Sequence, residues 1–99
     1  MNKIFEFKNI DHIAYVFNSL EDGYNFFQGH PGFELIKGPG INQTQKVRYL
    51  FVSVQKIGVI EILSPYGNNS PIKKRLLENG PGLYHICYAV DDIKKTILN

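Results

Sequence analysis

Several features that place proteins in special classes are missing or scarce in this sequence. The 99 residues contain one cysteine and no tryptophan. A lone cysteine can form neither an intrachain disulfide nor a cysteine-rich zinc site. Small folds held together by disulfides or by cysteine-bound zinc are therefore excluded. We interpret Cys87 as a small core residue.

Charge of one sign and long apolar runs are also scarce. Eleven Lys and Arg against nine Asp and Glu give a formal net charge of +2, and the one basic cluster, at residues 73–75, is typical of a solvated helix face. No run approaches the roughly 20 apolar residues of a membrane span, and Glu6 and Lys8 interrupt the segment where a secretory signal would be apolar. We therefore expect a cytoplasmic protein that binds neither nucleic acid nor a membrane.

The composition that is present is that of a folded globular protein. Hydrophobic residues make up 43% of the chain and aromatic residues 13%, with seven Phe and six Tyr. A chain of this length fits one hydrophobic core, because single domains usually hold roughly 100–150 residues. We expect one domain over residues 1–99.

A short repeat relates the two ends of the chain. Residues 12–20 read HIAYVFNSL and residues 85–93 read HICYAVDDI, so that His12 pairs with His85. Each copy has an apolar run of strand length, then Asn, Asp or Ser residues that can cap a helix N-terminus, then an amphipathic run. The pattern predicts a strand, a tight turn and a helix in each copy.

The residues between the two copies show shorter patterns. LEDGYNFFQ is a helix stopped by Pro31-Gly32, and FELIK predicts a brief strand before Gly38-Pro39-Gly40 breaks the chain. KVRYLFVSV and GVIEILS are stronger strands. The residues between them, 55–57, are too few for anything but a hairpin, so these two strands should be antiparallel neighbours.

A second helix is predicted before the second copy begins. Ser70 and Pro71 suit the Ncap and N1 positions of a helix, IKKRLLENG, that ends at Gly80 or Gly82. The predicted fold is therefore α+β: one βαβββ module, a connecting helix and the β-α start of a second module, which is cut short. Unpaired strand edges then predict completion by a partner chain, as in a homodimer, or by further chain.

Two histidines at matched positions of the repeat are candidates for chemistry. In the first copy His12 shares one strand face with Ala14, and in the second His85 shares a face with Cys87. The small neighbour leaves space beside each imidazole, as a concave ligand-holding sheet face needs. The alternative is that both are ordinary half-buried strand histidines.

The third candidate is Glu61, which lies within the apolar run VIEIL. A buried carboxylate is costly unless a cation or hydrogen-bond donors compensate it, although Glu61 facing solvent is the alternative. Two imidazoles and one carboxylate from three strands suit a divalent cation such as Zn, Co, Mn, Ni or Fe(II), with open positions for water or substrate. Their proximity is inferred from the topology.

The order of these segments resembles the vicinal oxygen chelate superfamily, which includes glyoxalases, bleomycin resistance proteins and dioxygenases, and is most similar to its methylmalonyl-CoA epimerase-like branch. The segments that carry the resemblance are DHIAYVFNSLEDGYNFF, VRYLFVSV, VIEILSP and SPIKKRLLENGPGLYHICYAVDDI. The resemblance implies two modules that pair into a cup. It also implies a metal held by His12, Glu61 and His85, with Glu61 at the catalytic centre.

Two further site residues are assigned to the substrate. In the loop ahead of the third strand, Gln43 and Thr44 precede Gln45, where epimerase-like members carry acidic residues before the Gln. We assign Gln45 and Arg48 to substrate contacts. Arg48 would pair with a carboxylate, against the alternative of a solvent-facing arginine. The final-strand glutamate that usually completes the metal site has no counterpart in the chain.

Three functions are consistent with this pattern, so we leave open whether the protein is an enzyme. The first is a metal-dependent isomerase or lyase of the epimerase or glyoxalase type, acting through a metal-stabilised enolate on a small carbonyl or acyl-thioester substrate. The second is a non-catalytic small-molecule-binding protein of the antibiotic-sequestering type. The third is an iron(II) dioxygenase. The aromatic walls expected for the second function are Tyr15, Tyr49, Phe51 and Tyr88.

Overall fold

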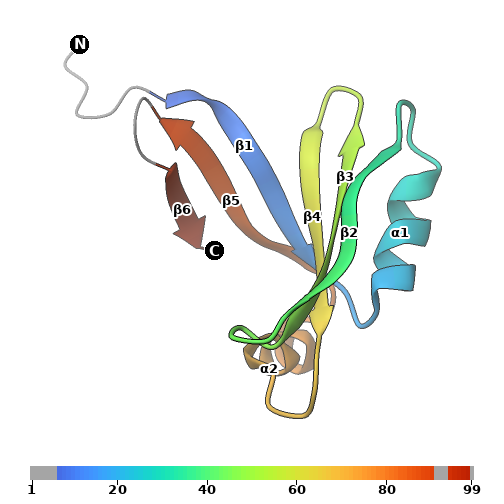
Figure 1. The fold of residues 1–99 in the computed structure, drawn as a ribbon, viewed down its shortest axis with the longest axis vertical. Helices are drawn as coiled ribbons and strands as arrows, with labels where there is room; N and C mark the ends of the chain where they lie inside the picture. Colours follow the sequence, from blue (N-terminus) through green and yellow to red (C-terminus); the bar gives the residue numbers. More distant parts are fainter. Residues whose placement is uncertain (1–6, 91–93, 99) are drawn as a thin grey trace.

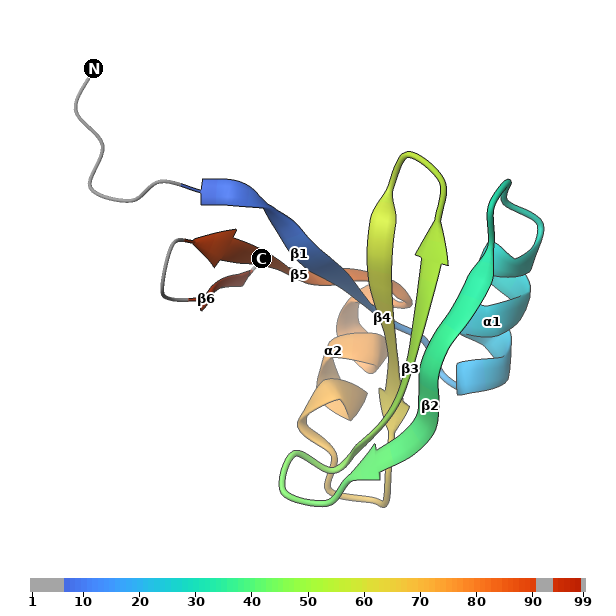
Figure 2. The ribbon, with the colours of Figure 1, turned by 45° about the horizontal axis from the view of Figure 1, so that its top comes forward.

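The polypeptide forms one mixed sheet with a helix on each face (Figure 1, Figure 2). The computed structural model describes residues 7–90 and 94–98, with side chains over residues 12–84. Its elements are β1 (Phe7–Val16), α1 (Leu20–Gln28), β2 (Glu34–Asn42), β3 (Val47–Val54), β4 (Gly58–Pro65), α2 (Pro71–Asn79), β5 (Gly82–Val90) and β6 (Lys94–Leu98). The strand order is β2-β3-β4-β1-β5-β6, and the predicted α+β class is confirmed.

The sheet divides into two groups of strands at β1. Strands β2, β3 and β4 are antiparallel neighbours, and β4 pairs with β1 in parallel only over residues 13–16 of β1. The earlier part of β1 stays with β5, which in turn pairs with β6. The two groups therefore diverge, as Figure 1 shows. We call the point of divergence, beside His12 of β1 and Glu61 of β4, the fork.

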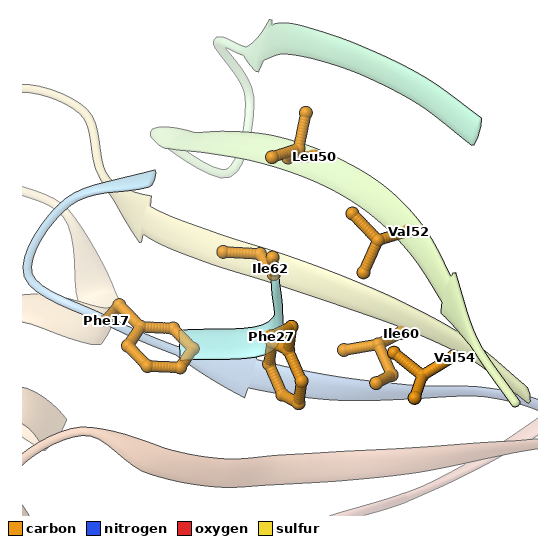
Figure 3. Close-up of a cluster of buried hydrophobic side chains, with 7 residues drawn as sticks. All are labelled: Phe17, Phe27, Leu50, Val52, Val54, Ile60 and Ile62. Atoms are coloured by element: carbon orange, nitrogen blue, oxygen red, sulfur yellow. The ribbon is translucent and has the colours of Figure 1, made fainter. Parts of the chain in front are cut away.

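Helix α1 begins where its sequence predicts and packs on one face of the sheet. The Ser19 hydroxyl accepts a hydrogen bond from the Asp22 N–H at 3.1 Å, which is an N-cap. The buried side of the helix, at Gly23 and Phe27, faces the strands. The resulting α1-side core, drawn in Figure 3, contains Phe17, Phe27, Leu50, Val52, Val54, Ile60 and Ile62.

Helix α2 covers part of the opposite face. It begins at Pro71 after Ser70 and ends at Gly80, which has φ 73°, so the predicted cap residues are confirmed. Arg75 donates hydrogen bonds to the carbonyls of Gly80 at 2.7 Å and Leu83 at 2.8 Å, which ties the helix to the start of β5. The α2-side core contains Ala14, Val16, Val47, Leu63, Ile72 and Leu76.

None of the described helices has the length and apolar character to cross a bilayer.

Strand β2 differs from its prediction, because it runs through Gly38-Pro39-Gly40 instead of ending there. The register against β3 shifts between Lys37 and Gly40, so the strand absorbs the irregular residues as a bulge. Proline is tolerated because β2 is an edge strand, where one side of the backbone needs no partner. A Cβ at Gly40 would overlap the end of the Tyr49 ring, so a larger residue here would have to displace that ring.

The end of the chain also differs, because the predicted second-module helix is wrong. Residues 94–98 form strand β6, antiparallel to β5. A helix this short is unstable without a surface to pack on, whereas the edge of β5 offers backbone hydrogen bonds directly. The predicted helix cap at Asp91 lies outside the described residues.

Candidate metal and substrate site

His12 and Glu61 meet across the fork. His12 Nε2 lies 3.3 Å from Glu61 Oε1, and the two side chains are 17% and 19% exposed. Both groups are thus largely withdrawn from water and still open to a ligand. A carboxylate in this environment needs a cation or hydrogen-bond donor beside it, and the imidazole occupies that position. Glu61 is thus half-buried beside an imidazole, and its role as a ligand stays a prediction.

The pair forms because strand alternation and sheet register act together. His12 lies on the same face of β1 as Ala14, and Ala14 is the Cα partner of Glu61 in the parallel pairing with β4. Ala14 is fully buried and carries only a methyl group. The longer His12 and Glu61 side chains can therefore approach each other diagonally over it.

Aromatic rings and a lysine continue this surface across β3 and β2. Phe51 is the Cα partner of Glu61, and its ring meets the His12 ring edge-on with centroids 5.7 Å apart. The ring centroids of Tyr49 and Phe51 are 6.0 Å apart. Lys37 Nζ lies 5.9 Å from each of these two centroids. We call the surface made by His12, Lys37, Tyr49, Phe51 and Glu61 the site face.

The backbone places His85 in the row of residues that crosses the fork. Ala14 is the Cα partner of Glu61 on one side and of His85 on the other. By register, His85 therefore belongs to the row of backbone positions that also holds Ala14 and Glu61. The side chains of His85 and Cys87 lie outside the described residues, and the assignment of His85 as a ligand stays a prediction.

The chemistry of the two described donors fits a divalent cation. Imidazole nitrogen and carboxylate oxygen are ordinary ligands of Zn and neighbouring metals, and two such atoms bound to one cation at about 2.1 Å lie roughly 3.0–3.4 Å apart. The separation of His12 Nε2 and Glu61 Oε1, 3.3 Å, falls in that interval. Over the described side chains, no group of three or more His, Cys, Asp or Glu gathers at a metal-binding distance. A third ligand would have to be His85 or come from elsewhere.

Arg48 and Gln45 lie away from the pair. The Cα partner of Arg48 is Ser64, and alternation along β3 puts Arg48 on the α1 side with Leu50, opposite the site face. Its guanidinium stands 5.3 Å from the Tyr66 ring centroid. Gln45 lies in the exposed turn between β2 and β3, where its N–H donates to Asn42 Oδ1 at 3.0 Å. The structure does not bring Arg48 together with His12 and Glu61.

The predicted aromatic walls are partly correct. Tyr49 and Phe51 line the site face, but Tyr15 is on the α1 side, stacked on Phe17 at 6.5 Å, so its assignment to this wall is wrong. The Tyr88 side chain lies outside the described residues. Sequence reasoning missed Lys37, although a lysine inside the apolar strand FELIK is a usable signal. Its position over two rings depends on the register shift in β2, which no local pattern predicts.

The fold and the site face together define the class of protein. A model of the Glyoxalase/Bleomycin resistance protein/Dioxygenase superfamily matches residues 11–99, and the chain belongs to this superfamily. The curated proteins that it resembles include methylmalonyl-CoA epimerases. The mitochondrial methylmalonyl-CoA epimerase of Dictyostelium discoideum is 30% identical over 90 residues, which are 89% of this chain and 52% of that protein.

A second curated relative and two solved structures agree. The ethylmalonyl-CoA/methylmalonyl-CoA epimerase of Cereibacter sphaeroides is 33% identical over 85% of this chain and 62% of its own length. Methylmalonyl-CoA epimerase from Mycobacterium tuberculosis is 24% identical, with a TM-score of 0.77 over 94% of this chain and 62% of that chain, which shows the shared fold. A Streptomyces coelicolor methylmalonyl-CoA epimerase variant in complex with 2-nitronate-propionyl-CoA is 27% identical. Its TM-score is 0.72, over 89% of this chain and 66% of that chain. The chain thus spans between half and two thirds of these proteins.

Proposed function

We propose that this chain supplies the His12–Glu61 half of a divalent-metal site in an epimerase-type isomerase acting on an acyl-CoA thioester. The observation that supports the proposal is the 3.3 Å contact between an imidazole nitrogen and a carboxylate oxygen on an open, aromatic-lined sheet face. The sequence identity of 30% and 33% to epimerases from two organisms supports the reaction class. A cytoplasmic location is part of the same proposal.

Each residue of the site face has a distinct role in this proposal. His12 and Glu61 hold the cation, which when bound supplies Lewis-acid polarisation of substrate oxygens. Phe51 packs edge-on against the imidazole and restricts its rotation. Tyr49 and Phe51 exclude water from one side, and Lys37 places a positive charge where an anionic acyl group would arrive.

The remaining ligands come from His85 and from a second module. Ala14 joins Glu61 and His85 in one row, so a cation held by His12 and Glu61 lies beside the backbone position of His85. A partner copy or further chain would close the cup over the site face. A second module from elsewhere agrees with the length of the relatives, because the chain spans 52% and 62% of the two curated epimerases.

Metal binding is the first test. We expect the protein to bind Co²⁺ or Zn²⁺ near one per chain in a calorimetric titration, and His12→Ala or Glu61→Gln to weaken binding by about 100-fold, because each removes a ligand. His30→Ala is the matched control, since His30 Nδ1 donates to the Phe27 carbonyl of α1 and is not part of the site face. Equal loss in His12→Ala and His30→Ala would contradict the proposed site.

Proton exchange is the second test. We expect the metal-loaded protein to catalyse exchange of the α-proton of methylmalonyl-CoA in heavy water, followed by mass spectrometry, and Glu61→Gln to lose that exchange. Glu34→Gln removes an exposed carboxylate on β2 and serves as the control. Stoichiometric metal without exchange would retain the metal site and contradict the epimerase reaction.

One observation favours the non-catalytic alternative. The turn between β2 and β3 carries Gln43, Thr44 and Gln45, none of which can accept a proton near neutral pH. If the second module brings no base, the same aromatic face would hold a small molecule without turnover. Saturable binding of methylmalonyl-CoA with no exchange would identify this binding function. Oxygen consumption with Fe(II) and a catechol would instead identify a dioxygenase.

A further inference from the structure

A cavity lies on the α1 side of the sheet, away from the site face. It has a volume of about 550 Å³, which is within the range of small-molecule sites. It opens between the start of α1 and strands β2, β3 and β4. Its lining is Asn18, Ser19, Leu20, Glu21, Tyr24, Leu35, Pro39, Arg48, Leu50, Ser64 and Pro65.

The lining combines apolar side chains with polar groups from two places, the start of α1 and the neighbouring strands β3 and β4. Arg48 on β3 is the Cα partner of Ser64 on β4, so the two side chains project side by side into the α1 side. Arg48 is exposed, and its guanidinium stands 5.3 Å from the Tyr66 ring centroid. The site therefore has an apolar wall on one side and a cation at its edge.

Ser64 is the second, independent sign of a ligand. Its side chain is 1% exposed, and its hydroxyl oxygen has no hydrogen-bond partner among the described residues. Buried hydroxyls in folded proteins are nearly always hydrogen-bonded to protein, water or ligand. A ligand headgroup held beside Arg48 would provide the missing partner.

The charge at the cavity favours an anion over a cation. Arg48 lies beside the unpartnered Ser64 hydroxyl, and the cavity includes the first turn of α1, whose backbone N–H groups favour negative charge. Glu21 is the carboxylate among the described lining residues, and together with Asp22 in the same turn it offsets the positive potential of the helix start. Arg48 is therefore the group that gives the cavity its preference for an anion.

We propose that this cavity binds a small amphipathic carboxylate, with its hydrocarbon part against Leu20, Leu35 and Leu50 and its headgroup between Arg48 and Ser64. The strand alternation that puts Arg48 on this face removes it from His12 and Glu61. The site is therefore separate from the proposed metal centre, and the two can fail independently.

The test uses octanoate as the probe and the whole 99-residue chain labelled with ¹⁵N. We expect saturable shifts of the amides of Leu20, Leu35 and Leu50, with a dissociation constant on the order of 1 mM. Octan-1-ol, which lacks the charge, should bind roughly threefold to tenfold more weakly. Equal binding of the alcohol and the acid would overturn the role of Arg48 and with it the proposal.

Two pairs of variants locate the site. Arg48→Gln should weaken octanoate binding by roughly threefold to tenfold, while Lys74→Gln, an exposed cation on α2, should leave it unchanged. Leu35→Trp should block the cavity, and Leu77→Trp, at a position 81% exposed, should not. The amide spectrum of each variant reports its folding. Shifts spread over the surface, or binding that survives Leu35→Trp, would overturn the proposal.

Discussion

Gly23 shows how closely helix and sheet approach at the scale of single residues. It is buried on the inner side of α1, and a Cβ added there would overlap Ile62 Cγ2 and lie 2.8 Å from Phe17 Cδ1. These atoms belong to the packed α1-side core and have little freedom to move. Any side chain at this position must push the helix away from β4.

We therefore expect Gly23→Ala to lower the free energy of unfolding by about 1–3 kcal/mol, measured by urea denaturation. Gly29→Ala is the matched control. Gly29 has φ −80° and open space around its Cβ direction, so alanine should leave stability unchanged or raise it by about 0.4–1 kcal/mol. Equal destabilisation by both substitutions would contradict the close approach at Gly23.

Helix α2 packs on the same side of the sheet as the site face. Ile72 and Leu76 pack over Ala14, Val16 and Leu63 on the face that also carries His12 and Glu61. The next residue along, Leu77, is 81% exposed, whereas Leu76 is 8% exposed. One turn of the helix thus offers a buried and an exposed leucine in the same local context.

This contrast gives a prediction at the scale of the element. Leu76→Ala should lower the free energy of unfolding by about 2–3 kcal/mol, because it leaves a cavity between α2 and the sheet. Leu77→Ala should change it by less than about 0.5 kcal/mol. Chemical denaturation followed by circular dichroism measures both. A similar loss in the two variants would show that α2 does not dock on the sheet through Leu76.

The strand elements show why local patterns succeed in some places and not in others. The β3–β4 hairpin is correctly predicted because two alternating runs are separated by three residues and each partner is nearby in the chain. β2 and β6 are not, because an edge strand is selected by the neighbour it pairs with. Gly38-Pro39-Gly40 continues β2 along β3, and residues 94–98 follow the edge of β5.

At the scale of the whole molecule, the outer edge of β2 exposes apolar side chains. Leu35, Ile36 and Ile41 of β2 are 50%, 51% and 45% exposed, and β2 has a neighbour on one side only. Exposed apolar edge strands recruit another chain or segment, because their backbone groups and side chains both gain from pairing.

We expect the isolated chain to associate in solution. Light scattering coupled to gel filtration should give a mass near twice the 11.3 kDa of the chain, falling toward the monomer on dilution. A stable monomer at all concentrations would contradict completion by a second copy. Loss of metal binding on dilution, in parallel with dissociation, would place ligands of the site on both copies.

The sequence by itself determined the elements whose causes are local. Ser19 marks a helix start through its capping hydroxyl, Ser70-Pro71 marks one through the proline at the first helical position, and strand alternation puts His12 and Ala14 on one face. The α+β order of one βαβββ module and the resemblance to epimerases follow from these local patterns, as the superfamily match confirms.

Only the tertiary structure decided which of these residues meet. The 3.3 Å contact of His12 with Glu61 depends on the parallel register of β1 with β4, and these strands are separated in the chain by α1, β2 and β3. Alternation along β3 and its antiparallel register with β4 place Arg48 on the opposite face, beside Ser64 and away from the pair. Register is a property of pairing between distant segments, and it depends on how both faces of the sheet are buried by α1 and α2.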